Sequence, residues 1–115
     1  MTKKEIAAMV KNIGFPYAYY CFPNNTPQSP PFVCFYYTGS DDFIADGKNY
    51  QSIKNLRIEF YSDNKDFDTE TKIGNILNQH GLVYVSDDTY IDSERMFMTV
   101  FETEVPIDDE ESEVS

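Results

Sequence analysis

Apolar residues near the N-terminus recur at the spacing of one helical face, at Ile6, Met9, Val10 and Ile13. Thr2 and Glu5 precede this face with the spacing of a capping box, in which the two side chains satisfy the first free backbone N–H groups of a helix. The pattern predicts a helix from about Lys3 to Ile13. Gly14 and Pro16 then favour its termination.

Aromatic residues dominate the next two apolar runs, Tyr17–Phe22 and Phe32–Tyr37, which we predict to be strands. The segment between them is too rich in proline to form ladder hydrogen bonds. Further on, Phe43, Ile44 and Tyr50 flank an Asp46–Gly47 pair that is typical of a tight turn, so the segment from Ser40 to Tyr50 predicts a hairpin.

The second half of the chain opens with the clearest strand, in which Leu56, Ile58 and Phe60 alternate with polar or amphipathic neighbours. Asp63–Asp66 can cap a second helix that ends before Gly81. We expect one side of that helix to carry Phe67, Ile73, Ile76, Leu77 and, as a further candidate, His80.

Three segments complete the predicted order. Leu82–Val85 reads as a short strand, Ser86–Asp92 as a polar turn and Arg95–Val105 as a long strand. The strand alternates Met96, Met98 and Val100 with Phe97, Thr99 and Phe101, and we expect its first half to be apolar on both sides. One small core cannot satisfy both sides, so we predict that Met96, Met98 and Val100 make subunit contacts.

The order of elements predicts an α+β fold, a two-layer sandwich with two helices on one face of a mainly antiparallel sheet. The other face is then open for association. We expect a single domain over residues 1–105. Residues 106–115 are expected to form a disordered acidic tail, because like charges repel and there is little to bury.

Composition narrows the functional classes. At 115 residues and 13.3 kDa the chain suits one domain, and its net charge of −11 opposes binding to nucleic acid or to an anionic membrane. The chain shows neither the apolar length of a membrane span nor a signal-peptide pattern, so we expect a soluble protein made in the cytoplasm. Cys21 and Cys34 are expected to be buried thiols and not a disulfide framework.

Residues that could carry out a reaction are few. His80 is the single histidine, and neither cysteine lies in an electropositive setting that would activate it. A zinc site lacks ligands, and the acidic run from Asp63 to Asp68 lacks the glycine and the glutamate that a calcium loop needs. The five glycines are scattered, so there is no phosphate-binding loop. We therefore predict no catalytic site, no cofactor and no metal.

Tyrosine on the strands is the unusual feature that remains, because it combines an apolar ring with a polar tip and is enriched at interfaces. Completion of a small core and formation of an interface explain these rings equally well at this stage. They are Tyr19, Tyr20, Tyr36, Tyr37 and Tyr61.

The joint order of several short runs resembles the tail-terminator or tail-completion proteins of long-tailed phages and prophages of Gram-positive bacteria. The resemblance covers about Thr2 to Val105. The runs that carry it are Lys3–Ile6, Ala18–Tyr20 with Phe22 and Pro23, Pro30–Phe32 leading into Cys34–Tyr37, Asp63–Phe67, and Tyr90–Met98.

This resemblance implies a virion protein that forms a hexameric ring at the head-proximal end of the tail tube, where it stops tube polymerisation. It implies as partners other copies of the chain, the major tail tube protein and the head–tail connector proteins. Assembly would occur in the host cytoplasm. The loop near the lumen of such rings corresponds to Ser40–Tyr50, which we expect to be mobile in the free subunit and to bury Phe43, Ile44 and Tyr50 on assembly.

Three alternatives remain open. Other neck proteins, which join head and tail, have similar size and architecture. An acidic mimic of DNA that inhibits a nucleic-acid enzyme would fit the charge, and a regular array of surface carboxylates would favour it. A ligand-binding or enzymatic domain would require Cys34 or His80 to line a pocket.

Overall fold

The structure is a computed structural model that describes residues 1–20, 22, 28–40, 43–45 and 48–108, and for residues 40, 43–45 and 48–51 the backbone alone. Its elements in chain order are α1 (Lys3–Lys11), β1 (Tyr17–Tyr19), β2 (Phe32–Ser40), β3 (Phe43–Ala45), β4 (Lys48–Ser62), α2 (Phe67–Gln79), β5 (Tyr84–Ile91) and β6 (Met96–Ile107).

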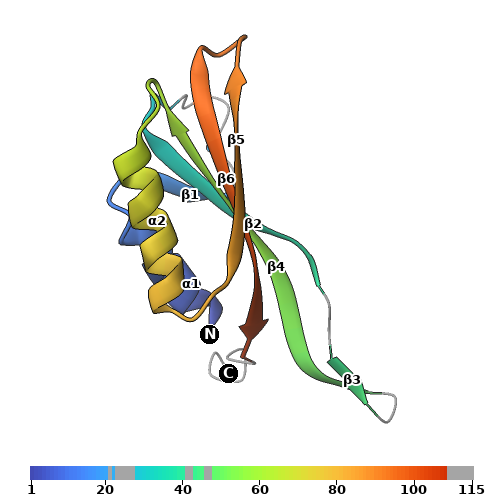
Figure 1. Ribbon diagram of the computed structural model, residues 1–115. Coiled ribbons are helices and arrows are strands. Elements are labelled where there is room, and N and C mark those ends of the chain that lie inside the picture. The colour runs from blue at the N-terminus through green and yellow to red at the C-terminus, as the bar shows by residue number, and fades with distance from the viewer. Residues whose placement is uncertain (21, 23–27, 41–42, 46–47, 109–115) are drawn as a thin grey trace.

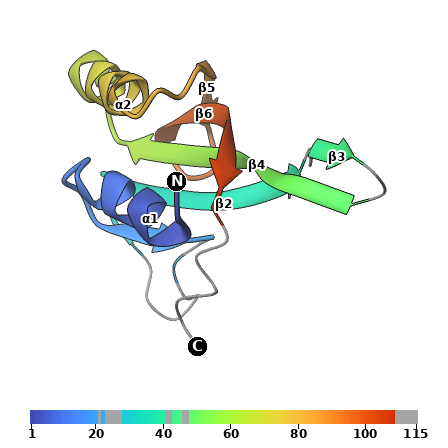
Figure 2. The same cartoon turned by 90° about the horizontal axis from the view of Figure 1, so that it is seen from below.

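Five strands form one twisted sheet in the order β1-β2-β4-β6-β5, and β3 pairs with the projecting end of β4 (Figure 1). The β1–β2 pair is parallel and the other pairs are antiparallel. Both helices pack on the same face of this sheet, as Figure 2 shows from below. The predicted α+β architecture is therefore confirmed.

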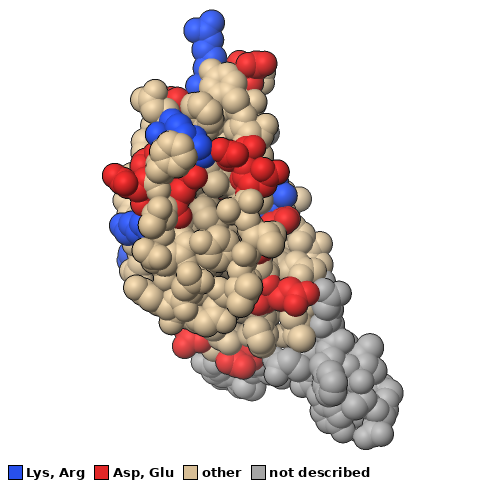
Figure 3. Space-filling view, viewed as in Figure 1, with Lys and Arg blue, Asp and Glu red and all other residues tan. Residues whose placement is uncertain are grey.

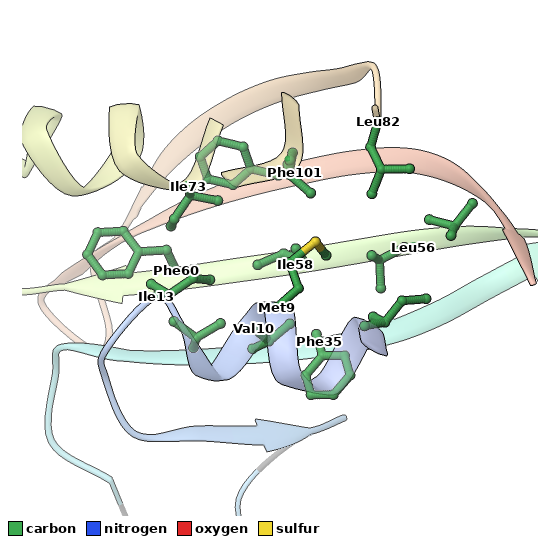
Figure 4. Packing of buried hydrophobic residues seen from close by; sticks show 14 of the residues in the cluster. Met9, Val10, Ile13, Phe35, Leu56, Ile58, Phe60, Ile73, Leu82 and Phe101 are labelled. Atoms are coloured by element: carbon green, nitrogen blue, oxygen red, sulfur yellow. The ribbon is translucent and has the colours of Figure 1, made fainter. Parts of the chain in front are cut away.

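The core lies between the helices and this face. In Figure 4, α1 crosses in front of β2 and α2 lies beside β6, with Phe60 of β4 between them. Each fully buried large apolar side chain contributes about 1.5–3 kcal/mol. The largest such side chains are Phe60, Ile6, Met9, Ile13, Leu56, Ile58, Ile73 and Leu77.

Local capping chemistry sets the helix ends. The predicted capping box is present, since the Thr2 Oγ1 accepts from the Glu5 N–H and the Glu5 carboxylate accepts from the Thr2 N–H. Helix α1 ends at Lys11, two residues earlier than predicted. In α2, Ile73 and Leu77 are buried as predicted, but Phe67 is 68% exposed at the first position of the helix and His80 is exposed at its C-cap.

The segment from Ser86 to Asp92, predicted to be a polar turn, is instead most of strand β5. This strand forms the edge of the sheet and pairs with β6 alone among the described strands. Because its side chains are largely exposed on both faces, they show no alternation of polar and apolar residues. The turn comes later, at residues 92–95, where Arg95 takes a φ of +54°.

Strand β4 joins two segments that the sequence separated, the returning arm of the hairpin and the strand around Ile58. Pairing of β4 with β2 ends at Lys54 and pairing with β6 ends at Ser52. The residues before them pair with β3 only, so the predicted hairpin is present as backbone and projects from the body (Figure 1). Its turn at residues 46–47 lies outside the described residues.

The first and last described residues, Met1 and Asp108, contact each other. Strand β6 continues to Ile107, which is 6% exposed, and the Asp108 N–H donates to the Met1 carbonyl at 2.9 Å. The expectation that the chain from Pro106 onward buries almost nothing is therefore wrong as far as Asp108. Residues 109–115, the rest of the predicted acidic tail, lie outside the described part.

Strand β1 is shorter than predicted, because Tyr20 has a left-handed φ of +73° that ends the extended run. Cys21 falls outside the described residues, whereas Cys34 is buried in β2 as predicted. Neither described helix is long and apolar enough to cross a membrane.

Candidate interaction surface

The sheet has a second face, here called the outer face, that no described helix covers. Side chains alternate along a strand, so the burial of Leu56, Ile58 and Phe60 under the helices turns Arg57, Glu59 and Tyr61 the other way. The same alternation places further residues of the neighbouring strands on this face. They are Phe32, Cys34 and Tyr36 of β2, Met96, Met98, Val100, Glu102 and Glu104 of β6, and Val85, Asp87 and Thr89 of β5.

Aromatic rings pack against one another across one half of the outer face. Phe32 stacks on Tyr61 at a centroid separation of 4.6 Å and meets Phe22 edge-on at 5.5 Å. The ring centroids of Tyr20 and Tyr36 lie 4.9 Å apart. These rings are therefore held in place by contacts on the surface side of the sheet, where tyrosine is suited to contact another protein.

A single carboxylate, that of Glu59, lies at the centre of this half and is only 8% exposed. Its Oε2 accepts from the Arg57 Nε at 2.7 Å and from the Tyr36 hydroxyl at 3.1 Å, and its Oε1 accepts from the Tyr61 hydroxyl at 2.7 Å. A buried charge is tolerable when it is paired and hydrogen-bonded in this way. The three donors come from two strands, so the carboxylate fixes the orientation of both tyrosine rings.

The protonation states follow from this arrangement. Burial raises the pKa of the Tyr61 phenol far above its usual range, and the hydrogen bond to Glu59 raises it further. Burial and the same carboxylate also raise the pKa of Tyr36, and the hydrogen bond to Glu59 raises the pKa of Arg57. At neutral pH both phenols are protonated and can donate.

The predicted contact residues of β6 lie on the outer face beside this cluster. Met96, Met98 and Val100 are half-buried, and Met98 is opposite Tyr61 on one side and Thr89 on the other. Of the predicted hairpin residues, Phe43 and Ile44 lie in β3 and Tyr50 lies in β4. The β6 residues and the hairpin residues therefore lie in different parts of the fold, and the side chains of the hairpin residues are outside the described part.

The other half of the outer face contains a shallow depression of about 410 Å³ at the start of β5. Val83 and Val85 on its wall are 86% and 68% exposed, which is unusual for valine. Glu102 and Glu104 of β6 line the same depression. The sequence analysis did not single out these residues, since only their position at a sheet edge leaves the valines uncovered.

The residues considered for catalysis are not brought together. Cys34 is buried on the outer face of β2, and His80 is at the exposed end of α2 on the opposite face of the sheet. Within the described ranges, no three His, Cys, Asp or Glu side chains are arranged to hold a metal ion. In Figure 3, on the side seen in Figure 1, acidic side chains form several patches beside the basic ones, in keeping with the net charge of −11.

Comparisons with known proteins give a likeness of fold. Neither a family model nor a curated protein matches the chain. Among solved structures, the chain is similar to one from "Virion of native gene transfer agent (GTA) particle", with a TM-score of 0.53 and 15% sequence identity. The match covers 87% of this chain and 85% of the other, so the two share their fold over nearly the whole length.

Proposed function

We propose that this protein is a structural, non-catalytic component of a phage or phage-like virion. The observation that carries the proposal is the fold shared with a chain of a gene transfer agent virion over 87% of the present chain. The uncovered outer face supports it, because a rigid aromatic surface is suited to contact other subunits.

Within the virion, we propose the role of tail terminator or tail-completion protein at the head-proximal end of the tail tube. The support is the sequence resemblance together with a backbone hairpin, β3 with the start of β4, that extends beyond the paired strands of the body. The copies would form a ring, expected to be a hexamer. One side of the ring would contact the major tail tube protein and the other the head–tail connector proteins.

Deletion of the gene, followed by electron microscopy of the particles, tests this proposal. A terminator stops polymerisation, so its absence should give overlong tubes without heads. Normal-length tails that fail to join heads would instead indicate another neck protein. Normal infectious particles would contradict a structural role, and stoichiometric binding of the purified protein to a nucleic-acid enzyme would then favour the DNA mimic.

A variant of the hairpin tests the finer role. Phe43 and Ile44 lie beyond the points where β2 and β6 pair with β4, so replacing both by Ser should leave the isolated domain folded. The same variant should lengthen tails in a complementation assay. If the variant also destabilises the isolated protein, the hairpin belongs to the core. If phage carrying the variant make tails of normal length, the hairpin does not have the proposed role.

A further inference from the structure

The depression on the outer face has a specific chemical character. It presents exposed apolar surface, Val83 and Val85, beside the carboxylates of Glu102 and Glu104. A second, smaller depression of about 210 Å³ continues it towards Asp87. Among the described residues, Arg57 is the one cation paired with Asp87, Glu102 or Glu104, and its contact is to Glu102 at 3.4 Å.

A surface of the opposite character lies on α1. Lys4, Ala8 and Lys11 are all exposed, and their spacing of four and three residues places them along one ridge of the helix. In the part of the chain that the structure describes, neither lysine is joined to a carboxylate. The ridge therefore combines two available ammonium groups with a small apolar residue between them.

The two surfaces lie on opposite sides of the subunit. Helix α1 packs on the helix-covered face in front of β2 (Figures 2 and 4). The carboxylates and valines of the depression, in contrast, lie on the outer face of β6 and β5. The depression spans the sheet from Thr38 of β2 to β5, and its exposed valines lie at the β5 edge, which is opposite the β1 edge in the strand order β1-β2-β4-β6-β5. They cannot meet within one subunit.

We infer that the α1 ridge of one copy docks into the outer-face depression of the next copy. The lysine stems would cover Val83 and Val85, as long cationic side chains do on apolar surface, while the ammonium groups reach Glu104 in the depression and Asp87 in its smaller continuation. A contact between two different surfaces on opposite sides is head-to-tail, and its repetition gives a ring or a filament. The inference rests on the self-assembly in the proposed function and identifies the surfaces that carry it.

Charge reversal tests this contact. In variant one, Lys4→Glu and Lys11→Glu make the ridge acidic; in variant two, Asp87→Lys and Glu104→Lys make the depression basic. Each variant alone should lose association by about tenfold or more, because like charges then face each other. Mixed in equal amounts, the two variants should associate again, since every contact in an alternating assembly becomes complementary.

The design separates local complementarity from net charge. Variant two makes the protein less negative overall, so general repulsion would predict stronger and not weaker association. All four positions are exposed. In variant one, the new glutamate at position 4 stabilises the N-terminal turn of α1 and the one at position 11 destabilises its C-terminal turn, so their effects on the helix dipole oppose each other. Circular dichroism should therefore report folded domains, and Arg95→Glu in the β5–β6 turn serves as a charge control outside both surfaces.

Sedimentation velocity of the purified full chain gives the readout. Association of wild type and of Arg95→Glu, its loss in each variant and its return on mixing would support the contact. A wild type that is monomeric at its highest soluble concentration, variants that associate like wild type, or a mixture that stays dissociated would each overturn it. Gene deletion tests virion function independently, because tail length does not depend on which surfaces join the copies in solution.

Discussion

Replacement of Gly74 by Ala should destabilise the protein, although Ala is the better helix former. Gly74 lies in the middle of α2 and is buried. A methyl group there would come within 2.9 Å of Tyr84 Cζ and closer still to its hydroxyl. The ring of Tyr84 is half-buried and packs on Phe101 at a centroid separation of 5.6 Å, so it cannot move aside without disturbing the start of β5.

Two opposing effects set the size of this change. Removal of a helical glycine stabilises by about 1 kcal/mol through backbone entropy. Overpacking of a well-filled site costs about 1–3 kcal/mol. Gly74→Ala in the wild-type protein should therefore reduce the free energy of unfolding by up to about 2 kcal/mol.

A double-mutant cycle with Tyr84→Ala isolates the steric cause. Without the ring, Gly74→Ala should stabilise by about 1 kcal/mol, because the helix-propensity gain is then unopposed. That sign reversal corresponds to a coupling of about 1–3 kcal/mol, within the range for side chains in contact. Tyr84→Phe, which keeps Cζ but removes the hydroxyl, should give an intermediate result.

Urea unfolding followed by circular dichroism measures these values, and a change of 1 kcal/mol shifts the Tm of a domain of this size by roughly 4 °C or more. If Gly74→Ala stabilises the wild-type protein as much as it stabilises the Tyr84→Ala protein, the ring yields without cost. The reasoning that α2 and β5 are docked through this close approach would then be wrong.

Three further predictions concern single side chains. Because burial raises the pKa of Tyr61, the folded state keeps the phenol protonated, and stability should fall as the pH rises above about 10. Tyr61→Phe should reduce this fall, and it should also lower the stability at neutral pH because the hydrogen bond to Glu59 is lost. The Thr69 hydroxyl and N–H lower the pKa of the Asp66 carboxyl, so the stability that this carboxylate adds is present above about pH 4 and lost below it. Asp66→Ala should reduce the free energy of unfolding by about 1 kcal/mol at pH 7, and Asp66→Asn should remove the acid dependence. Urea midpoints measured against pH check both results. Ile107→Ala should cost about 2–5 kcal/mol, and an unchanged Tm would show that the end of β6 is not part of the core.

The helices were predictable because their signals are local. In the capping box of Thr2 and Glu5 and in the N-cap of Asp66, the two partners are three residues apart in the sequence. The buried positions of α1 recur with the period of a helix. Strand β5 was not predictable in this way. A strand that is exposed on both faces has no alternation, and its extent is set by the backbone of β6, which pairs with it from Tyr84 to Ile91.

The candidate surface was predictable in part, because alternation along a strand is also a local signal. Alternation along β6 places Met96, Met98 and Val100 on one face, and they lie on the outer face. Alternation in β4 also turned Glu59 away from the core, but its burial depends on the Tyr36 hydroxyl from another strand. The pairing register that aligns such groups is a tertiary property, and a single sequence does not state it.

The two halves of the outer face should respond differently to salt. The half with Phe32, Tyr61 and Met98 is largely apolar, and the Glu59 carboxylate at its centre is already satisfied within the subunit. Contacts made through that half would strengthen or stay constant as salt rises, because added salt screens the repulsion between subunits that are each strongly negative. Contacts through the depression depend on carboxylates that meet lysines of another copy, so screening weakens them. Sedimentation across ionic strength therefore distinguishes the halves. Association that weakens with salt indicates the depression, and association that strengthens or stays constant with salt indicates the aromatic half.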